Sequence, residues 1–145
     1  MLTQSEADLL LRMSKRFADP VYALAMPPGH DESHELVGND SGDERFLLDT
    51  WRGCRRTMKL KFQTRSRKVF ILARLDIEGG PHTNPDGQRL GGTHLHLYRE
   101  GFDDKWAAPL DPVLFPDTSS IATAFQDFCR LCAIREPPTV GETLL

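Results

Sequence analysis

Three of the five histidines lie in one short stretch of the sequence, between Arg74 and Trp106. His82 precedes a turn, whereas His94 and His96 are separated by a single leucine. Histidine is the side chain whose unperturbed pKa lies nearest neutrality, so it suits both proton transfer and metal ligation. We therefore expect any functional site of this protein to lie in this stretch.

The spacing of the last two histidines fits one face of a β-strand. If residues 93–99 form a strand, alternation places His94, His96 and Tyr98 on one face and the intervening leucines on the other. A strand that carries histidines and a tyrosine on one face is unusual, because most strands show Lys, Glu or Thr to solvent. This face is therefore the first candidate for a site.

The strand before it, residues 69–77, is the most apolar of the chain and is expected to be central. Alternation separates Arg74 and Asp76 from an apolar set that should face the core, namely Val69, Ile71, Ala73, Leu75 and Ile77. If the two strands pair as a hairpin, Arg74 and Asp76 can share a face with the strand histidines. His82 lies in the connecting loop and could fold back over that face, although the sequence does not determine the register across so long a loop.

Three uses of these residues compete. The first is metal-free cleavage of RNA, in which the 2′-hydroxyl is the nucleophile and the protein supplies a base, an acid and cations. The second is a zinc site formed by the His-x-His pair, and the third is a set of exposed histidines with no chemical role. The first use is our leading hypothesis, without a cofactor or metal, and its catalytic candidates are His82, His94, His96, Arg74, Asp76 and Tyr98.

A concentrated basic block lies just before the histidines. Residues 50–75 contain nine basic residues and no acidic one, although the net charge of the chain is −3. Such a block can bind phosphates, or an acidic protein surface, despite a low pI. The candidate nucleic-acid-binding residues are those of the block and of the segment after the histidines: Arg55, Arg56, Lys59, Lys61, Arg65, Arg67, Lys68, Arg99 and Lys105.

Helices are expected at both ends of the chain. Thr3-Gln4-Ser5-Glu6 has the spacing of a capping box, and apolar residues follow at helical intervals. The first helix should therefore run from about Gln4 to Phe17. Asp117 or Thr118 could cap the last helix, whose apolar stripe includes both cysteines of a Cys-x-x-Cys pair, so we expect these to be buried thiols and not metal ligands.

About six mainly antiparallel strands are expected between the helices. The chain is thus predicted to be a single α+β domain, residues 1–145, with an extended tail from about residue 136. Both helices should cover one face of the sheet and leave the other at least partly open, with the basic and histidine-rich surface on it. His30 and His34 lie in a polar, acidic segment and are expected to be solvated. No apolar run approaches ~20 residues, so we expect a cytoplasmic protein without membrane contact.

Three longer runs resemble an uncharacterised bacterial and prophage family. They are FLLDTWRG at Phe46–Gly53, LARLDIEGGPHTNPDG at Leu72–Gly87 and HLHLYREGFDDKWA at His94–Ala107. This resemblance covers most of the chain and implies no activity.

A second resemblance does imply one. The order Arg74-x-Asp76, Pro81-His82-x-Asn84 and His94-x-His96, followed by a C-terminal helix, is similar to the TumE-like toxins of toxin–antitoxin modules, over about residues 69–130. Those small proteins are described as RNA-cleaving, so the resemblance implies a toxin-type endoribonuclease with RNA and an antitoxin as partners. The alternative is a non-enzymatic phage or prophage protein that inhibits a host defence complex through its basic surface.

Overall fold

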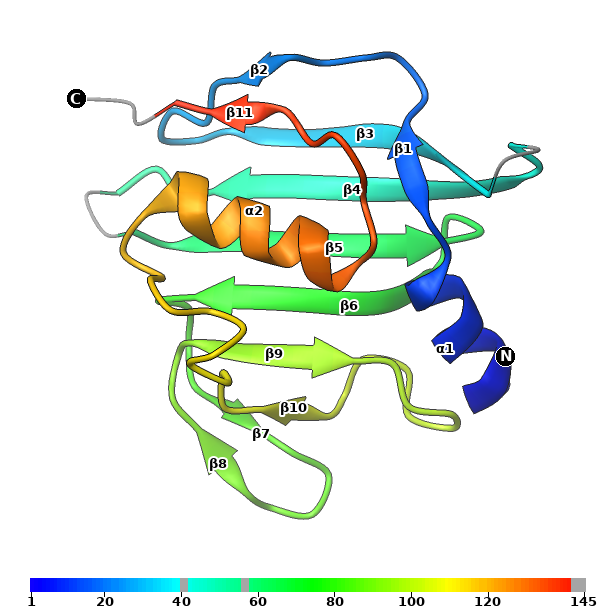
Figure 1. The fold of residues 1–145 in the computed structure, drawn as a ribbon. Coiled ribbons are helices and arrows are strands. Elements are labelled where there is room, and N and C mark those ends of the chain that lie inside the picture. The colour runs from blue at the N-terminus through cyan, green and yellow to red at the C-terminus, as the bar shows by residue number, and fades with distance from the viewer. Residues whose placement is uncertain (40–41, 56–57, 142–145) are drawn as a thin grey trace.

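The computed structural model describes residues 1–39, 42–55 and 58–141 and contains a large antiparallel sheet with two helices (Figure 1). The sheet has seven strands, close to the expected number of about six, in the order β1-β3-β4-β5-β6-β9-β10. The strands are β1 (Lys15–Phe17), β3 (Asp31–Gly38), β4 (Glu44–Arg52), β5 (Leu60–Ser66), β6 (Phe70–Ile77), β9 (His94–Leu97) and β10 (Ala107–Ala108). The α+β class and the helices near both ends are confirmed.

Two short sheets accompany the large one. β2 (Ala23–Leu24) pairs in parallel with β11 (Thr139–Val140), so part of the tail that was expected to be extended joins a strand pair. β7 (His82–Thr83) pairs with β8 (Arg89–Leu90) in a hairpin that leaves the large sheet after β6 and returns to it at β9. Within the described ranges, no helix is long and apolar enough to cross a bilayer.

The two helices pack on the same face of the sheet. α1 (Gln4–Arg12) begins with the predicted capping box, in which Thr3 and Glu6 each accept a hydrogen bond from the other's backbone nitrogen. α2 (Ile121–Leu131) lies across β4, β5 and β6 in Figure 1 and places Phe125 and Phe128 against Phe62 of β5. These aromatic contacts form the centre of the core.

Both helices differ from the prediction at one end. α1 stops at Arg12 and not at Phe17, because the residues that follow pair with β3 as β1. α2 is capped by Ser120, whose hydroxyl accepts a hydrogen bond from the backbone of Thr123, and not by Asp117 or Thr118. Cys129 and Cys132 are buried, as expected, and burial raises the pKa of Cys132 to about 11.

A bulge in β6 changes which of its side chains face the core. The register with β5 skips Leu72, so Leu72 and Ala73 are adjacent in sequence and both buried. Beyond the bulge the predicted core residues are indeed buried: Ala73, Leu75 and Ile77. Before the bulge the alternation is reversed, so the prediction for Val69 and Ile71 is wrong; Val69 is 70% exposed and Ile71 is only half-buried.

A hairpin covers part of the sheet face that the helices leave free. We refer to residues 79–92, which contain β7 and β8, as the flap. Gly79 donates a backbone hydrogen bond to Gly92 at 3.0 Å and closes the base of the flap. A Cβ atom at Gly92 would collide with the Gly79 carbonyl, so this approach requires glycine. At the tip, Gly87 donates to the Asn84 carbonyl at 2.9 Å, which confirms the predicted turn.

Candidate functional site

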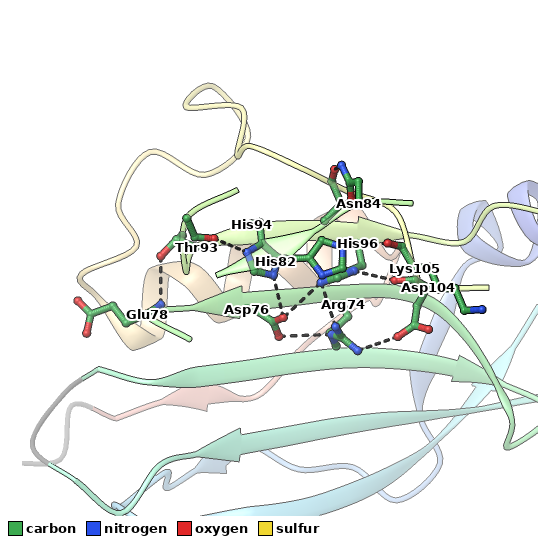
Figure 2. A network of polar contacts seen from close by, with 12 residues as sticks. Arg74, Asp76, Glu78, His82, Asn84, Thr93, His94, His96, Asp104 and Lys105 are labelled. Carbon is green, nitrogen blue, oxygen red and sulfur yellow. Dashed lines mark hydrogen bonds and ion pairs between the residues drawn. The ribbon is translucent and has the colours of Figure 1, made fainter. Parts of the chain in front are cut away.

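β6, β9 and the flap bring five of the predicted catalytic residues together on the sheet face opposite α2 (Figure 2). The register pairs Arg74 with His96 and Asp76 with His94, so these four side chains share one face, as predicted. His82 folds back over them, and its ring centroid lies 5.5 Å from that of His94 and 4.7 Å from that of His96. We refer to these five residues as the histidine cluster.

Two of the three histidines are buried. His94 is 2% exposed and His96 is 1% exposed, whereas His82 is half-buried. The expectation of an open, histidine-rich surface is therefore wrong at this edge of the sheet, because the flap and the segment before β10 contact the rings. A substrate can reach the inner histidines only if the flap moves.

Each of the three rings is anchored by one backbone carbonyl. The contacts are His94 Nδ1 with Gly91 O at 2.7 Å, His96 Nδ1 with Asp104 O at 2.7 Å, and His82 Nε2 with Lys105 O at 2.8 Å. A carbonyl oxygen can only accept a hydrogen bond, so these ring nitrogens carry a proton. The other nitrogen of each ring remains for chemistry.

Opposite charges lie beside the remaining nitrogens of the two inner rings. Oδ2 of Asp76 lies 3.1 Å from Nε2 of His94 and 3.3 Å from Nε2 of His96. Arg74 donates from Nη2 to Nε2 of His96 at 2.9 Å and from Nη1 to the Asp104 carboxylate at 2.7 Å. Nε2 of His96 therefore faces both a guanidinium donor and a carboxylate acceptor. His94 faces an oxygen acceptor at both nitrogens and satisfies both only as an imidazolium.

Asp76 is held as a carboxylate by its neighbours. Burial by itself would raise the pKa of Asp76, but the contact with His96 and the positive charge of Arg74 outweigh it, so the pKa is lowered. The negative charge of Asp76 thus persists at neutral pH, 3.1 Å from Nε2 of His94.

The lowered pKa of Asp76 predicts a pH-dependent contribution to stability. A carboxyl group whose pKa is lower in the folded than in the unfolded protein stabilises the fold above its unfolded pKa, about 4, and this stabilisation is lost as the pH falls further. We expect the unfolding free energy of wild type to be higher than that of Asp76→Asn. This difference should be largest at neutral pH and should shrink below about pH 4. Urea unfolding at several pH values measures it, and a difference that is independent of pH would contradict the assignment.

The side chain of Asn84 connects the flap to β10 through two hydrogen bonds, a role that the sequence did not predict. This side chain donates to the carbonyl of Ala107 at 2.9 Å and accepts from the nitrogen of Ala107 at 2.8 Å, and the residue is 3% exposed. The contact of His82 with the Lys105 carbonyl joins the same two parts of the chain. The sequence indicated only a turn at Asn84, because these partners lie 23 residues away along the chain.

A hollow of about 320 Å³ lies beside the histidine cluster on the sheet face opposite α2. It is lined by one carboxylate, the base of the flap and residues of β4 and β5 with their flanks: Asp76, Gly79, Gly80, Trp51, Lys59, Leu60 and Lys61. The ammonium groups of Lys59 and Lys61 lie 5.9 and 5.8 Å from the centroid of the half-buried Trp51 ring. An aromatic surface flanked by lysines suits the bases and phosphates of a single-stranded nucleic acid. The sequence alone does not indicate this role for Trp51.

Among the other basic candidates in the described residues, Arg65 lines a second hollow together with Trp51 and Lys61. Three of these candidates contact other side chains: Arg65 with Asp49 at 2.7 Å, Arg67 with Glu44 at 3.5 Å, and Arg99 over the Trp106 ring at 4.1 Å from its centroid. The hydrogen bond with Asp49 raises the pKa of Arg65 further. Arg55, Lys68 and Lys105 are exposed, and Arg56 lies outside the described residues.

Tyr98 does not belong to the histidine cluster, so its prediction as a catalytic residue on that face is wrong. It is 5% exposed, and its hydroxyl accepts a hydrogen bond from the nitrogen of Leu2 and donates one to the carbonyl of Leu2. Burial raises the pKa of Tyr98. β9 ends at Leu97, and the nitrogen of Tyr98 donates to Leu72, the bulge residue of β6, so the alternation does not continue to Tyr98.

These features define an α+β protein with a buried cluster of histidine, aspartate and arginine beneath a hairpin on an antiparallel sheet. A family model described as a family of unknown function, DUF6978, matches residues 2–134. The chain belongs to this family, which agrees with the expected membership of an uncharacterised family. No curated protein and no solved structure matches the chain.

Proposed function

We propose that this protein is a toxin-type endoribonuclease that cleaves RNA without a metal ion. The observation that carries the proposal is a group of three imidazole rings in mutual contact, two of which also contact a carboxylate or a guanidinium, next to a hollow lined by an aromatic ring and two lysines. Proton transfer to and from RNA needs both neutral and protonated imidazoles, and the developing charge needs a cation. The motif order shared with TumE-like toxins supports the same assignment by analogy.

The residues of the cluster can be given roles in a transfer reaction within the RNA. His82 would take the proton of a 2′-hydroxyl, whose oxygen attacks the adjacent phosphorus while the bond to the 5′-oxygen breaks. His94 would donate its proton to that 5′-oxygen, and Asp76 would keep His94 protonated and oriented. Arg74 would stabilise the charge on the phosphate oxygens. The products are a 2′,3′-cyclic phosphate and a 5′-hydroxyl.

The hollow gives the RNA a place to bind before it is cleaved. A base stacked on Trp51 would have its phosphates near Lys59 and Lys61 and would lie next to Asp76 and the base of the flap. Release of the Asn84 contacts with Ala107 would then let the flap open over the inner histidines. In this proposal an antitoxin with an acidic surface would inhibit the protein by occupying the same lysine-flanked hollow.

RNA binding should depend on Trp51 and the two lysines. Trp51→Ala should weaken the affinity for a single-stranded RNA oligonucleotide by about 10-fold, since stacking contributes about 1–3 kcal/mol per base. Lys61→Gln should weaken binding. It should also reduce the slope of log affinity against log salt concentration by the amount expected for about one phosphate contact. Fluorescence anisotropy at several salt concentrations measures both effects, and Lys68→Gln, an exposed lysine at the β5–β6 turn, is the matched control.

The purified protein separates this proposal from its alternative. Cleavage of RNA that persists in EDTA supports a metal-independent enzyme. If the protein binds RNA but cleaves none, or if it binds no RNA at low salt, the enzyme proposal is withdrawn. The non-enzymatic alternative would then take its place. In that alternative the protein is an inhibitor that binds a protein or nucleic acid through its basic residues.

A further inference from the structure

A second group of metal-binding residue types lies on β3, on the opposite face of the sheet from the histidine cluster. His30 immediately precedes β3, and Glu32 and His34 follow at intervals of two residues, on the face that carries buried Leu36. His30 is 7% exposed and His34 is half-buried, so the expectation that both are solvated is wrong. Their burial means that their orientations are set by the fold.

The ligand atoms of these three side chains converge without forming hydrogen bonds to one another. His30 Nδ1 lies 3.9 Å from Oε1 of Glu32, His34 Nε2 lies 3.6 Å from Oε2 of Glu32, and one ligand atom from each residue lies within 4.8 Å of the other two. These distances are too long for hydrogen bonds. They are close to the separation of about 3.3–3.6 Å between ligands of a tetrahedral ion with bonds of roughly 2.0–2.2 Å.

Neighbouring groups hold the two imidazoles in place. The hydroxyl of Thr50 lies 2.7 Å from Nε2 of His30 and 3.4 Å from Nε2 of His34, and the ring of Phe17 packs 5.5 Å from that of His34. For His30, whose Nδ1 faces Glu32, the hydroxyl is an oxygen partner on the outer nitrogen, which is the usual way in which a metal-binding imidazole is oriented. For His34 the hydroxyl lies beside the same Nε2 that faces Glu32.

We refer to His30, Glu32 and His34 as the β3 group. The histidine cluster differs from the β3 group because the cluster already contains a cation. Arg74 donates to Nε2 of His96 at 2.9 Å, and its charge would repel a metal ion there. The β3 group instead combines two imidazoles with a carboxylate that is 53% exposed and open to solvent. We propose that His30, Glu32 and His34 bind one divalent transition-metal ion of the Zn²⁺ class, with water at the remaining position.

Calorimetric titration of Zn²⁺ into tag-free protein near neutral pH tests this site. Wild type should bind one ion through the β3 group. Glu32→Gln changes an exposed side chain, so it should fold normally and weaken that binding by about 100-fold. Thr50→Val removes the outer partner of the His30 ring and should weaken binding by about 10-fold. Asp76→Asn removes the carboxylate of the histidine cluster and serves as the control, since it should bind Zn²⁺ like wild type.

Three outcomes would overturn the proposal: no binding of Zn²⁺ by wild type, equal binding by wild type and Glu32→Gln, or loss of binding in Asp76→Asn but not in Glu32→Gln. The titration contains no RNA, so the result does not depend on the proposed nuclease activity. Conversely, RNA cleavage that persists in EDTA is compatible with a metal ion on β3, because the two groups lie on opposite faces of the sheet.

Discussion

His82→Ala should lower the rate of RNA cleavage by about 100-fold or more, the usual scale for the loss of one acid–base group. His82 is the one half-buried histidine of the cluster and lies on the flap, where a substrate would meet it first. The fold should tolerate the change, because the ring is anchored by a single hydrogen bond to the Lys105 carbonyl. Single-turnover cleavage of an RNA oligonucleotide gives the rate, and thermal unfolding checks the fold.

Thr83→Ala is the matched control for this experiment. Thr83 is the exposed neighbour of His82 on β7, so its replacement alters the same strand without removing an imidazole. The rate should stay within about 3-fold of wild type for Thr83→Ala, well below the effect of one acid–base group. Equal rates for wild type and His82→Ala would remove His82 from the mechanism, and equal losses in both variants would indicate damage to the flap.

Lys15→Met should lower the free energy of unfolding by about 3 kcal/mol, at about 1 kcal/mol for each hydrogen bond lost. Lys15 is 1% exposed, and its ammonium group donates to the carbonyls of Leu11, Met13 and Cys132 at 2.8–2.9 Å. Burial lowers the pKa of Lys15 to about 8, so the group still carries its charge at neutral pH. Methionine fills a similar volume but leaves all three carbonyls without a donor.

Urea unfolding followed by circular dichroism measures this loss. Lys59→Met makes the same chemical change at an exposed position and should alter the unfolding free energy by less than about 0.5 kcal/mol. A similar small change for Lys15→Met would show that water or a local shift satisfies the carbonyls. Because these carbonyls belong to the end of α1, the segment before β1 and the end of α2, the loss should affect cooperative unfolding of the whole core.

Strand periodicity predicted the pairing of residues in the site correctly, because it depends only on local geometry. Arg74, Asp76, His94 and His96 share one face since all four lie beyond the bulge, where the alternation is undisturbed. The same rule failed for Val69, which precedes the bulge at Leu72. It also failed for Tyr98, which follows β9 and donates a backbone hydrogen bond to Leu72. A bulge inserts one residue into the period of two, and nothing in the apolar run of β6 indicates where this happens.

Tertiary contacts account for the remaining errors. The spacing of apolar residues up to Phe17 is compatible with a helix, but pairing of Lys15–Phe17 with β3 prevails over it. The contacts of Asn84 and of His30 depend on partners 23 and 20 residues away in the sequence. Alternation could therefore predict which candidate residues meet, but not which of them are covered and by what.

The way in which the three histidines of the cluster are anchored determines which substitutions and deletions the site can tolerate. All three anchors are main-chain carbonyls, so substitutions at Gly91 or Lys105 that keep the backbone in place leave the ring orientations intact. The conformational entropy of the imidazoles is lost when the chain folds and not when a substrate arrives. A deletion in the turn at residues 99–104 would move the carbonyls of Asp104 and Lys105 and misalign the rings of His96 and His82, although every side chain of the cluster is retained. The site therefore depends on the length of this connection as well as on the Asp104 carboxylate that contacts Arg74.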